Sequence, residues 1–169
     1  MNNHQYISFT KQTQKILQRL EDSVLVGLLL LMIGMAVTQI FLRNLFGAGI
    51  VWSDVMLRIL VLWVGLIGAM VASRRDNHIA IDLLDRYLPE RAKVYTDFVV
   101  RLFTALISMI VAYYSLSFVQ MEFADGSIAF AGVPTWLCEA IIPFAFAVIA
   151  LRYFLLSFVN LKRIVNSRS

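Results

Sequence analysis

Four long runs of apolar residues divide this chain, and each is long enough to cross a lipid bilayer as a helix. The hydrocarbon core of a bilayer is about 30 Å thick, which requires roughly 20 residues at a rise of 1.5 Å each. Apolar residues surround the whole circumference of each predicted helix, whereas a soluble bundle needs polar outer faces. The predicted spans are residues 24–42, 51–72, 95–118 and 136–158. We therefore predict an all-α, polytopic membrane protein in which residues 1–169 form one domain of four transmembrane helices.

The segment before the first span is amphipathic. On a helix its apolar and its polar residues fall on opposite sides, with Phe9, Ile16, Leu17 and Leu20 on one and Lys11, Lys15, Gln18 and Arg19 on the other. This pattern predicts a helix at residues 8–22 that lies on the membrane surface. A partly disordered N-terminal tail is the alternative.

Basic residues are concentrated in alternate segments of the chain. The N-terminal segment, the loop between the second and third spans and the C-terminal tail together hold 11 Lys and Arg residues, whereas the other two loops hold only Arg43. The positive-inside rule then places both termini and the middle loop in the cytoplasm. Apolar residues recur through the middle loop up to Pro89 and favour a short interfacial helix there, with a solvated connector as the alternative.

Composition supports the membrane assignment and removes several other classes. The chain is 60% apolar and 15% charged, with a mean hydropathy of +0.75, against about 45–50% and 25% in soluble domains. A single cysteine, Cys138, excludes a disulfide framework. The net charge of +4 follows from the orientation signal, so it gives no reason to expect a nucleic-acid partner.

Charged residues inside the predicted spans need partners, because an ionisable group in hydrocarbon costs a few kcal/mol. At the outer ends, two cations and two anions fall at similar depth and predict a structural charge network of Arg43, Asp54, Arg58 and Glu139. The alternative is a proton or Na⁺ site built from Asp54 and Glu139.

At the cytoplasmic side, Asp97 and Arg101 form a second pair four residues apart, and Arg152 enters the same layer. Cations exceed acids here, so we expect the arginines either to reach lipid phosphates or to contact a partner subunit.

Small residues line one face of the second span. Gly65, Gly68, Ala69 and Ala72 give two small-xxx-small spacings that let another backbone approach closely. This spacing predicts a helix-packing face, either within the chain or against a partner.

The chain lacks the motifs of an enzyme. Its only histidines, His4 and His78, fall outside the predicted spans, which leaves no haem ligand within the membrane. We find no phosphate-binding loop, activated nucleophile or metal-ligand cluster, and we predict no catalytic residue, metal or cofactor. A membrane anchor or assembly subunit of a respiratory or other enzyme complex remains one alternative, and an autonomous small transporter is another.

The segment from Phe41 to Leu84 resembles the small four-helix membrane subunit of TRAP (tripartite ATP-independent periplasmic) transporters. In that family an Arg ends the first helix, a Trp and an acid open the second, and a Gly-Ala stretch leads to a basic, His-containing loop. The matching positions are Arg43, Trp52, Asp54, Arg58, Gly68, Ala69, Arg74, His78, Ile79 and Asp82, followed by Leu88 and Pro89. Asp54 is a departure, since Glu is commonest there, and it keeps the charge on a shorter side chain.

The resemblance implies a non-catalytic scaffold in the bacterial inner membrane. In that family the small subunit pairs with a separate or fused large membrane subunit that carries the Na⁺ and substrate sites, and a periplasmic binding protein delivers an organic acid such as a C4-dicarboxylate or sialic acid. The expected partners are therefore the large subunit, the binding protein and membrane lipids.

The third loop, predicted at residues 120–134, holds Glu122 and Asp125 and no basic residue. These acids are candidate contacts for the binding protein, which they would help to orient. The alternative is that the loop lacks basic residues only because of the insertion rule.

The predicted orientation places Asp125 outside the cytoplasm. An Asp125→Cys variant should therefore react with a membrane-impermeant maleimide added to intact cells. Labelling only after the cytoplasmic side is exposed would contradict the assignment of both termini to the cytoplasm.

Overall fold

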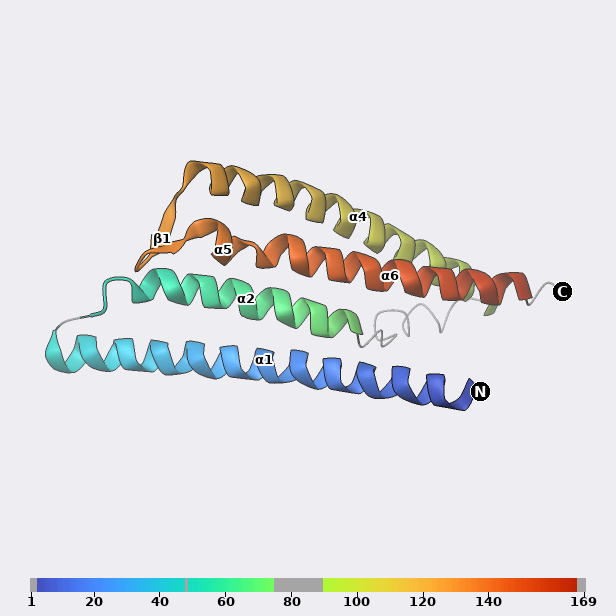
Figure 1. The fold of residues 1–169 in the computed structure, drawn as a ribbon, viewed down its shortest axis with the longest axis horizontal. Coiled ribbons are helices and arrows are strands. Elements are labelled where there is room, and N and C mark those ends of the chain that lie inside the picture. Colours follow the sequence, from blue (N-terminus) through green and yellow to red (C-terminus); the bar gives the residue numbers. More distant parts are fainter. Residues whose placement is uncertain (1–2, 48, 75–89, 167–169) are drawn as a thin grey trace. The chain divides into compact units, whose positions relative to one another are not determined.

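The computed structural model describes residues 3–47, 49–74 and 90–166, with side chains for 16–47, 49–74 and 95–158. Its helices and strands are, in chain order, α1 (Asn3–Phe46), α2 (Ser53–Arg74), α4 (Glu90–Asp125), β1 (Ile128–Phe130), β2 (Val133–Pro134), α5 (Thr135–Glu139) and α6 (Ile141–Asn166) (Figure 1). The chain forms two compact units, residues 1–71 with 128–133 and residues 72–127 with 134–169, and each is described here by itself.

Four helical segments are long and apolar enough to cross a membrane, as the sequence predicted. They comprise residues 16–46, 53–74, 95–125 and 135–158. Helices suit this environment because each satisfies its own backbone hydrogen bonds, for which hydrocarbon offers no other partner. The predicted middle-loop helix falls within residues 75–89 and so lies outside the described residues.

The first helix differs from the prediction. Residues 8–22 do not form an element separate from the first span, because α1 runs without a break from Asn3 to Phe46. The chain has neither Gly nor Pro before Gly27, so nothing in the local sequence ends the helix between the amphipathic and the apolar part. Placement of the amphipathic part on a membrane surface stays a prediction.

A side chain of α1 fixes the loop to α2. The Gln39 amide accepts a hydrogen bond from the Ile50 N–H at 3.1 Å and donates one to the Ile50 carbonyl at 3.4 Å. That carbonyl also accepts from the Ser53 hydroxyl at 2.8 Å and from the Ser53 N–H at 3.1 Å. A Cβ added at Gly49 would lie 2.8 Å from Gln39 Nε2, so glycine makes room for this amide clasp.

In the second unit, α4 and α6 run antiparallel and pack against each other (Figure 1). Their buried positions follow helical spacing, with Ala105 and Ser108 on α4 and Ala145 and Ile149 on α6. Three of these side chains, those of Ala105, Ser108 and Ala145, are small and let the two backbones approach closely, which is how helices associate in lipid.

The fourth predicted span is interrupted near its start. The short helix α5 ends at Glu139, Ala140 forms a turn, and α6 begins at Ile141. Pro143 explains the interruption, because it has no N–H to donate to the Glu139 carbonyl four residues earlier. The third span is longer than predicted, since α4 continues to Asp125.

A two-stranded hairpin, formed by β1 and β2, connects α4 to α5 and was not predicted. Its tip residues Ala131 and Gly132 both have positive φ, 46° and 84°, as a tight type I′ turn requires. Ala-Gly is a weaker signal for this turn than Asn-Gly or Asp-Gly, so the sequence pattern did not reveal it.

The amide clasp predicts a measurable contribution to stability. We expect Gln39→Leu to lower the free energy of unfolding by about 1–3 kcal/mol, because it removes two hydrogen bonds to a part-buried backbone group. Thermal unfolding of the purified protein in detergent measures the change. Thr38→Ala is the matched control, since the Thr38 hydroxyl bonds the Gly34 carbonyl within the same helix. Equal shifts for the two variants would show that the clasp does not stabilise the loop.

Candidate functional site

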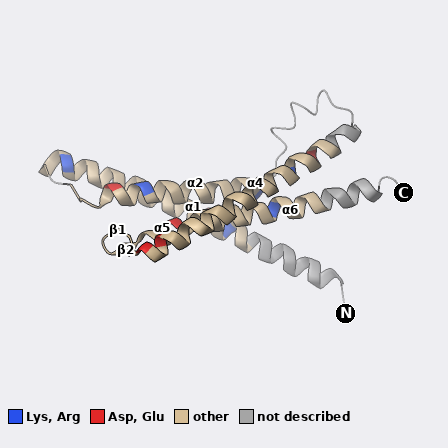
Figure 2. Cartoon of the chain, turned by 90° about the horizontal axis from the view of Figure 1, so that it is seen from above, with Lys and Arg blue, Asp and Glu red and all other residues tan. Residues whose placement is uncertain are grey.

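Most of the apolar surface of this chain faces outward. In the most apolar stretch of α1 no residue is buried. In the corresponding stretch of each of the other three spans, at most 22% of the residues are buried. Charged residues occupy only short stretches of the described helices (Figure 2). Surfaces of this kind contact lipid or another protein.

The small-residue face of α2 is unfilled in the part of the chain that the structure describes. Gly65, Ala69 and Ala72 are exposed and Gly68 is half-buried. A Cβ added at Gly65 or Gly68 would meet nothing within 4 Å. The face predicted from the sequence is thus open to close approach by a further helix.

The charged residues predicted at the outer end are not joined by the described structure. Asp54 and Arg58 are exposed one turn apart on α2, and no ion pair links them within residues 49–74. Arg43 is exposed in the last turn of α1. Glu139 belongs to the other unit, where its Oε2 is buried without a hydrogen-bond partner among the described residues. The four-residue network stays a prediction.

The structure pairs Asp97 with Arg101 on α4, whereas the cytoplasmic placement of this pair stays a prediction. Arg101 Nη2 lies 3.7 Å from Asp97 Oδ2, and the two side chains are only 9% and 18% exposed. Their position four residues apart on α4 brings the charges to the same helix face. Removing each charge from water costs desolvation energy. The attraction between the two charges offsets that cost.

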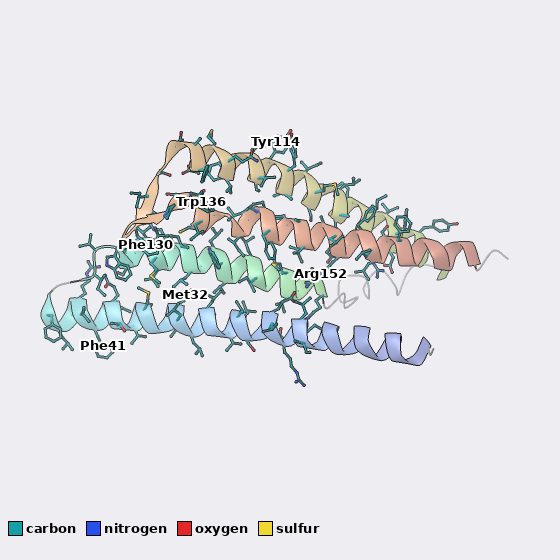
Figure 3. The ribbon with its side chains drawn as sticks, in the orientation of Figure 1. Met32, Phe41, Tyr114, Phe130, Trp136 and Arg152 are labelled. Atoms are coloured by element: carbon teal, nitrogen blue, oxygen red, sulfur yellow. The ribbon has the colours of Figure 1, made fainter. Side chains whose placement is uncertain are left out.

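Arg152 is held from a different element. Its Nη1 donates a hydrogen bond at 3.3 Å to the hydroxyl of Ser73, a buried residue near the end of α2 (Figure 3). The sequence predicts Arg152 in the cytoplasmic layer but does not identify Ser73 as its partner. The one signal in the sequence is that Ser73 is a polar residue inside an apolar run. Because 79 positions separate it from Arg152, this signal does not identify Arg152 as its partner. Further contacts of Arg101, Asp97 and Arg152 with lipid or a partner stay predictions.

The two acids assigned to the third loop lie on a helix. Glu122 and Asp125 belong to the last turns of α4, and their assignment to a loop was wrong because the helix extends further than its apolar run. The Ser127 hydroxyl donates a hydrogen bond to Glu122 Oε2, whereas Asp125 is exposed. Nearby, Phe123 and Trp136 meet edge to face with ring centroids 5.5 Å apart.

Among the described residues, no group of three or more His, Cys, Asp or Glu side chains is placed to hold a metal ion. Cys138 is a buried cysteine on α5 that forms no disulfide with another described residue. These side chains thus provide neither a metal site nor a disulfide in the described part of the chain.

The buried pair on α4 should matter more for stability than the exposed acid on α2. We expect Asp97→Asn to lower the free energy of unfolding by about 3 kcal/mol, because it removes the carboxylate that faces the buried Arg101 charge. Asp54→Asn is the control and should change stability by less than about 0.5 kcal/mol, since Asp54 is exposed. Unfolding in detergent measures both. A loss for Asp54→Asn as large as that for Asp97→Asn would contradict this ranking.

Comparison with known proteins gives the family. Residues 32–163 match the family described as tripartite ATP-independent periplasmic transporters, DctQ component. The chain is 31% identical over 88 residues to the sialic acid TRAP transporter permease protein SiaT of Haemophilus influenzae. The matched region covers 52% of this chain and 14% of SiaT.

Two small permease proteins are also similar. Identity is 29% over 84 residues with the sialic acid TRAP transporter small permease protein SiaQ of Vibrio cholerae, covering 50% of this chain and 49% of that protein. The sequence identity is 26% over 147 residues with the ectoine TRAP transporter small permease protein TeaB of Halomonas elongata. This match covers 86% of this chain and 76% of TeaB. The matches to SiaT and SiaQ thus span less than half of either relative. On the family match, which extends over most of its length, the chain belongs to the DctQ component family of TRAP transporters.

Proposed function

We propose that this protein is the small, non-catalytic membrane subunit of a TRAP transporter and acts as a fixed scaffold for the large membrane subunit. The family is a component of transporters rather than a class of enzymes. In this role the protein holds the large subunit in the inner membrane while that subunit moves substrate. Both termini lie in the cytoplasm.

The open small-residue face of α2 is the observation that carries the proposal. A Cβ added at Gly65 or Gly68 would meet no described atom within 4 Å, so these two positions add little packing energy to the isolated protein. They become useful when a helix of another chain packs there, because small side chains let the backbones make close van der Waals contact. The large subunit supplies such helices.

The exposed charges at the start of α2 support the same assignment. Asp54 and Arg58 lie on the helix that carries the small-residue face, and both are exposed. A charge inside a membrane is stable when it is paired or reaches water. Contact with polar groups of the large subunit would provide partners that the described residues of this chain do not supply.

The transported substrate is an organic acid taken up with Na⁺. Two relatives are named for sialic acid and one for ectoine. A scaffold that forms no substrate pocket does not itself select between such compounds. A periplasmic binding protein delivers the substrate, and the exposed carboxylate of Asp125 is available to attract basic groups on its surface.

A bulky side chain on the open face tests the proposal. Gly68→Leu should reduce co-purification of the large subunit in mild detergent by at least several-fold, because the added side chain blocks close approach of a helix. Gly68→Ala is the matched control and should retain most of the complex, since a single methyl group has open space around it.

The stability of the isolated small subunit distinguishes an external from an internal face. We expect Gly68→Leu to leave its thermal unfolding temperature in detergent unchanged. Retained complex together with a lower unfolding temperature would assign the face to packing within the chain. Co-purification of a soluble cofactor-bearing enzyme in place of a large membrane protein would replace the transporter assignment with that of a membrane anchor.

A further inference from the structure

Apolar side chains that are exposed, or half-buried in the case of Phe130, lie on the segments at the end of α1, the start of α2 and strand β1 in the first unit. Phe46 ends α1, Val51 and Trp52 precede α2, and Ile128 and Phe130 lie on strand β1 of the hairpin. Phe46, Val51 and Ile128 are 77%, 93% and 67% exposed. We call these five residues the apolar rim.

Specific contacts fix the part of the rim formed by Val51, Trp52 and Phe130. The rings of Trp52 and Phe130 stack with centroids 6.0 Å apart and planes 18° from parallel, which attaches the hairpin to the start of α2. The amide of Gln39 binds both polar backbone groups of Ile50, the residue directly before Val51. These contacts attach the backbone at Val51, Trp52 and Phe130, and Figure 3 shows Phe130 beside the first turn of α2.

The spans determine the depth of the rim. The candidate spans in this unit end at Phe46 and begin at Ser53, so the residues between them lie where the protein leaves the hydrocarbon. The stack of Phe130 on Trp52 brings the hairpin to the same level. Tryptophan and other aromatic residues favour this interfacial layer of a bilayer.

The charge pattern distinguishes lipid from a soluble protein as the partner. Residues 44–53 and 126–134 contain no Asp, Glu, Lys or Arg. Docking surfaces for soluble partners use charged residues to steer encounter, whereas large apolar side chains left in water are costly. Burial in the acyl-chain boundary removes that cost without any charged contact.

We propose that the apolar rim inserts into the adjacent leaflet at the boundary between headgroups and acyl chains. The hairpin then lies in the membrane surface and does not project into water. The bilayer is the partner, and the Trp52–Phe130 stack fixes the depth at which α1 and α2 end. This inference depends on the positions of the spans and is independent of the transporter assignment.

Site-directed spin labelling of the full chain tests the insertion. Val51→Cys, Ile128→Cys and Asp125→Cys, each in a Cys138→Ser background, are labelled with a nitroxide in nanodiscs of phosphatidylethanolamine and phosphatidylglycerol. Collision with apolar O₂ and with a water-soluble nickel chelate is then measured by electron paramagnetic resonance. We expect the O₂-to-nickel ratio at positions 51 and 128 to exceed that at the exposed control position 125 by several-fold.

Two results would overturn the proposal. A nickel accessibility at positions 51 and 128 equal to that at position 125 would place the rim in water. Low accessibility to both O₂ and nickel would mean that protein covers the rim. Repeating the measurement in the complex that co-purifies with the chain applies the same criteria to the assembled protein.

Tryptophan fluorescence gives a second readout that needs no label in the hairpin. In a Trp63→Phe, Trp136→Phe background, Trp52 is the sole tryptophan. Lipids brominated close to the headgroup should quench it several-fold more than lipids brominated near the bilayer centre. Absence of quenching by either lipid would also overturn the insertion.

Discussion

A helix surrounded by hydrocarbon gains nothing by hiding apolar side chains from lipid, and this constraint accounts for most of the structure. In water the same residues would collapse into a core. Here no residue in the most apolar stretch of α1 is buried, and the buried positions of α4 and α6 are occupied largely by small side chains. Close contact between backbones replaces the hydrophobic effect as the reason that helices associate.

Polar contacts are correspondingly few and each has a clear structural consequence. The amide of Gln39 attaches the loop after α1, and the guanidinium of Arg152 attaches the end of α2 to α6. Asp97 and Arg101 neutralise each other on one helix. Because an unpaired polar group is expensive in a medium of low polarity, such contacts specify geometry more strongly than they would at a soluble surface.

The sequence predicts what depends on length and on local spacing. Four spans follow from runs of about 20 apolar residues, and the Asp97–Arg101 pair follows from helical periodicity. The hairpin could not be predicted, since its turn uses Ala131 in a conformation that a residue other than glycine rarely adopts. Nor could the Arg152–Ser73 hydrogen bond, because no local pattern relates two residues that are 79 positions apart in the sequence.

The helix ends show the same division between local and nonlocal causes. Hydropathy located the spans but not their limits, so α4 extends beyond its apolar run to include Glu122 and Asp125. At the start of the fourth span, the interruption after Glu139 follows from Pro143 once the chain is known to be helical there. A proline within the first turns of a helix is otherwise common, and its presence alone did not predict a break.

The uninterrupted course of α1 has a mechanical consequence. Forty-four helical residues extend about 66 Å, roughly twice the hydrocarbon thickness. A straight α1 that crosses the membrane along the bilayer normal would extend about 35 Å beyond the hydrocarbon. Such a rod keeps other proteins at a set height above the lipid, whereas a sharp bend at the membrane surface would fold it flat. The stiffness of the helical turns near the membrane surface thus determines the distance between the lipid and a protein bound to the projecting part of α1.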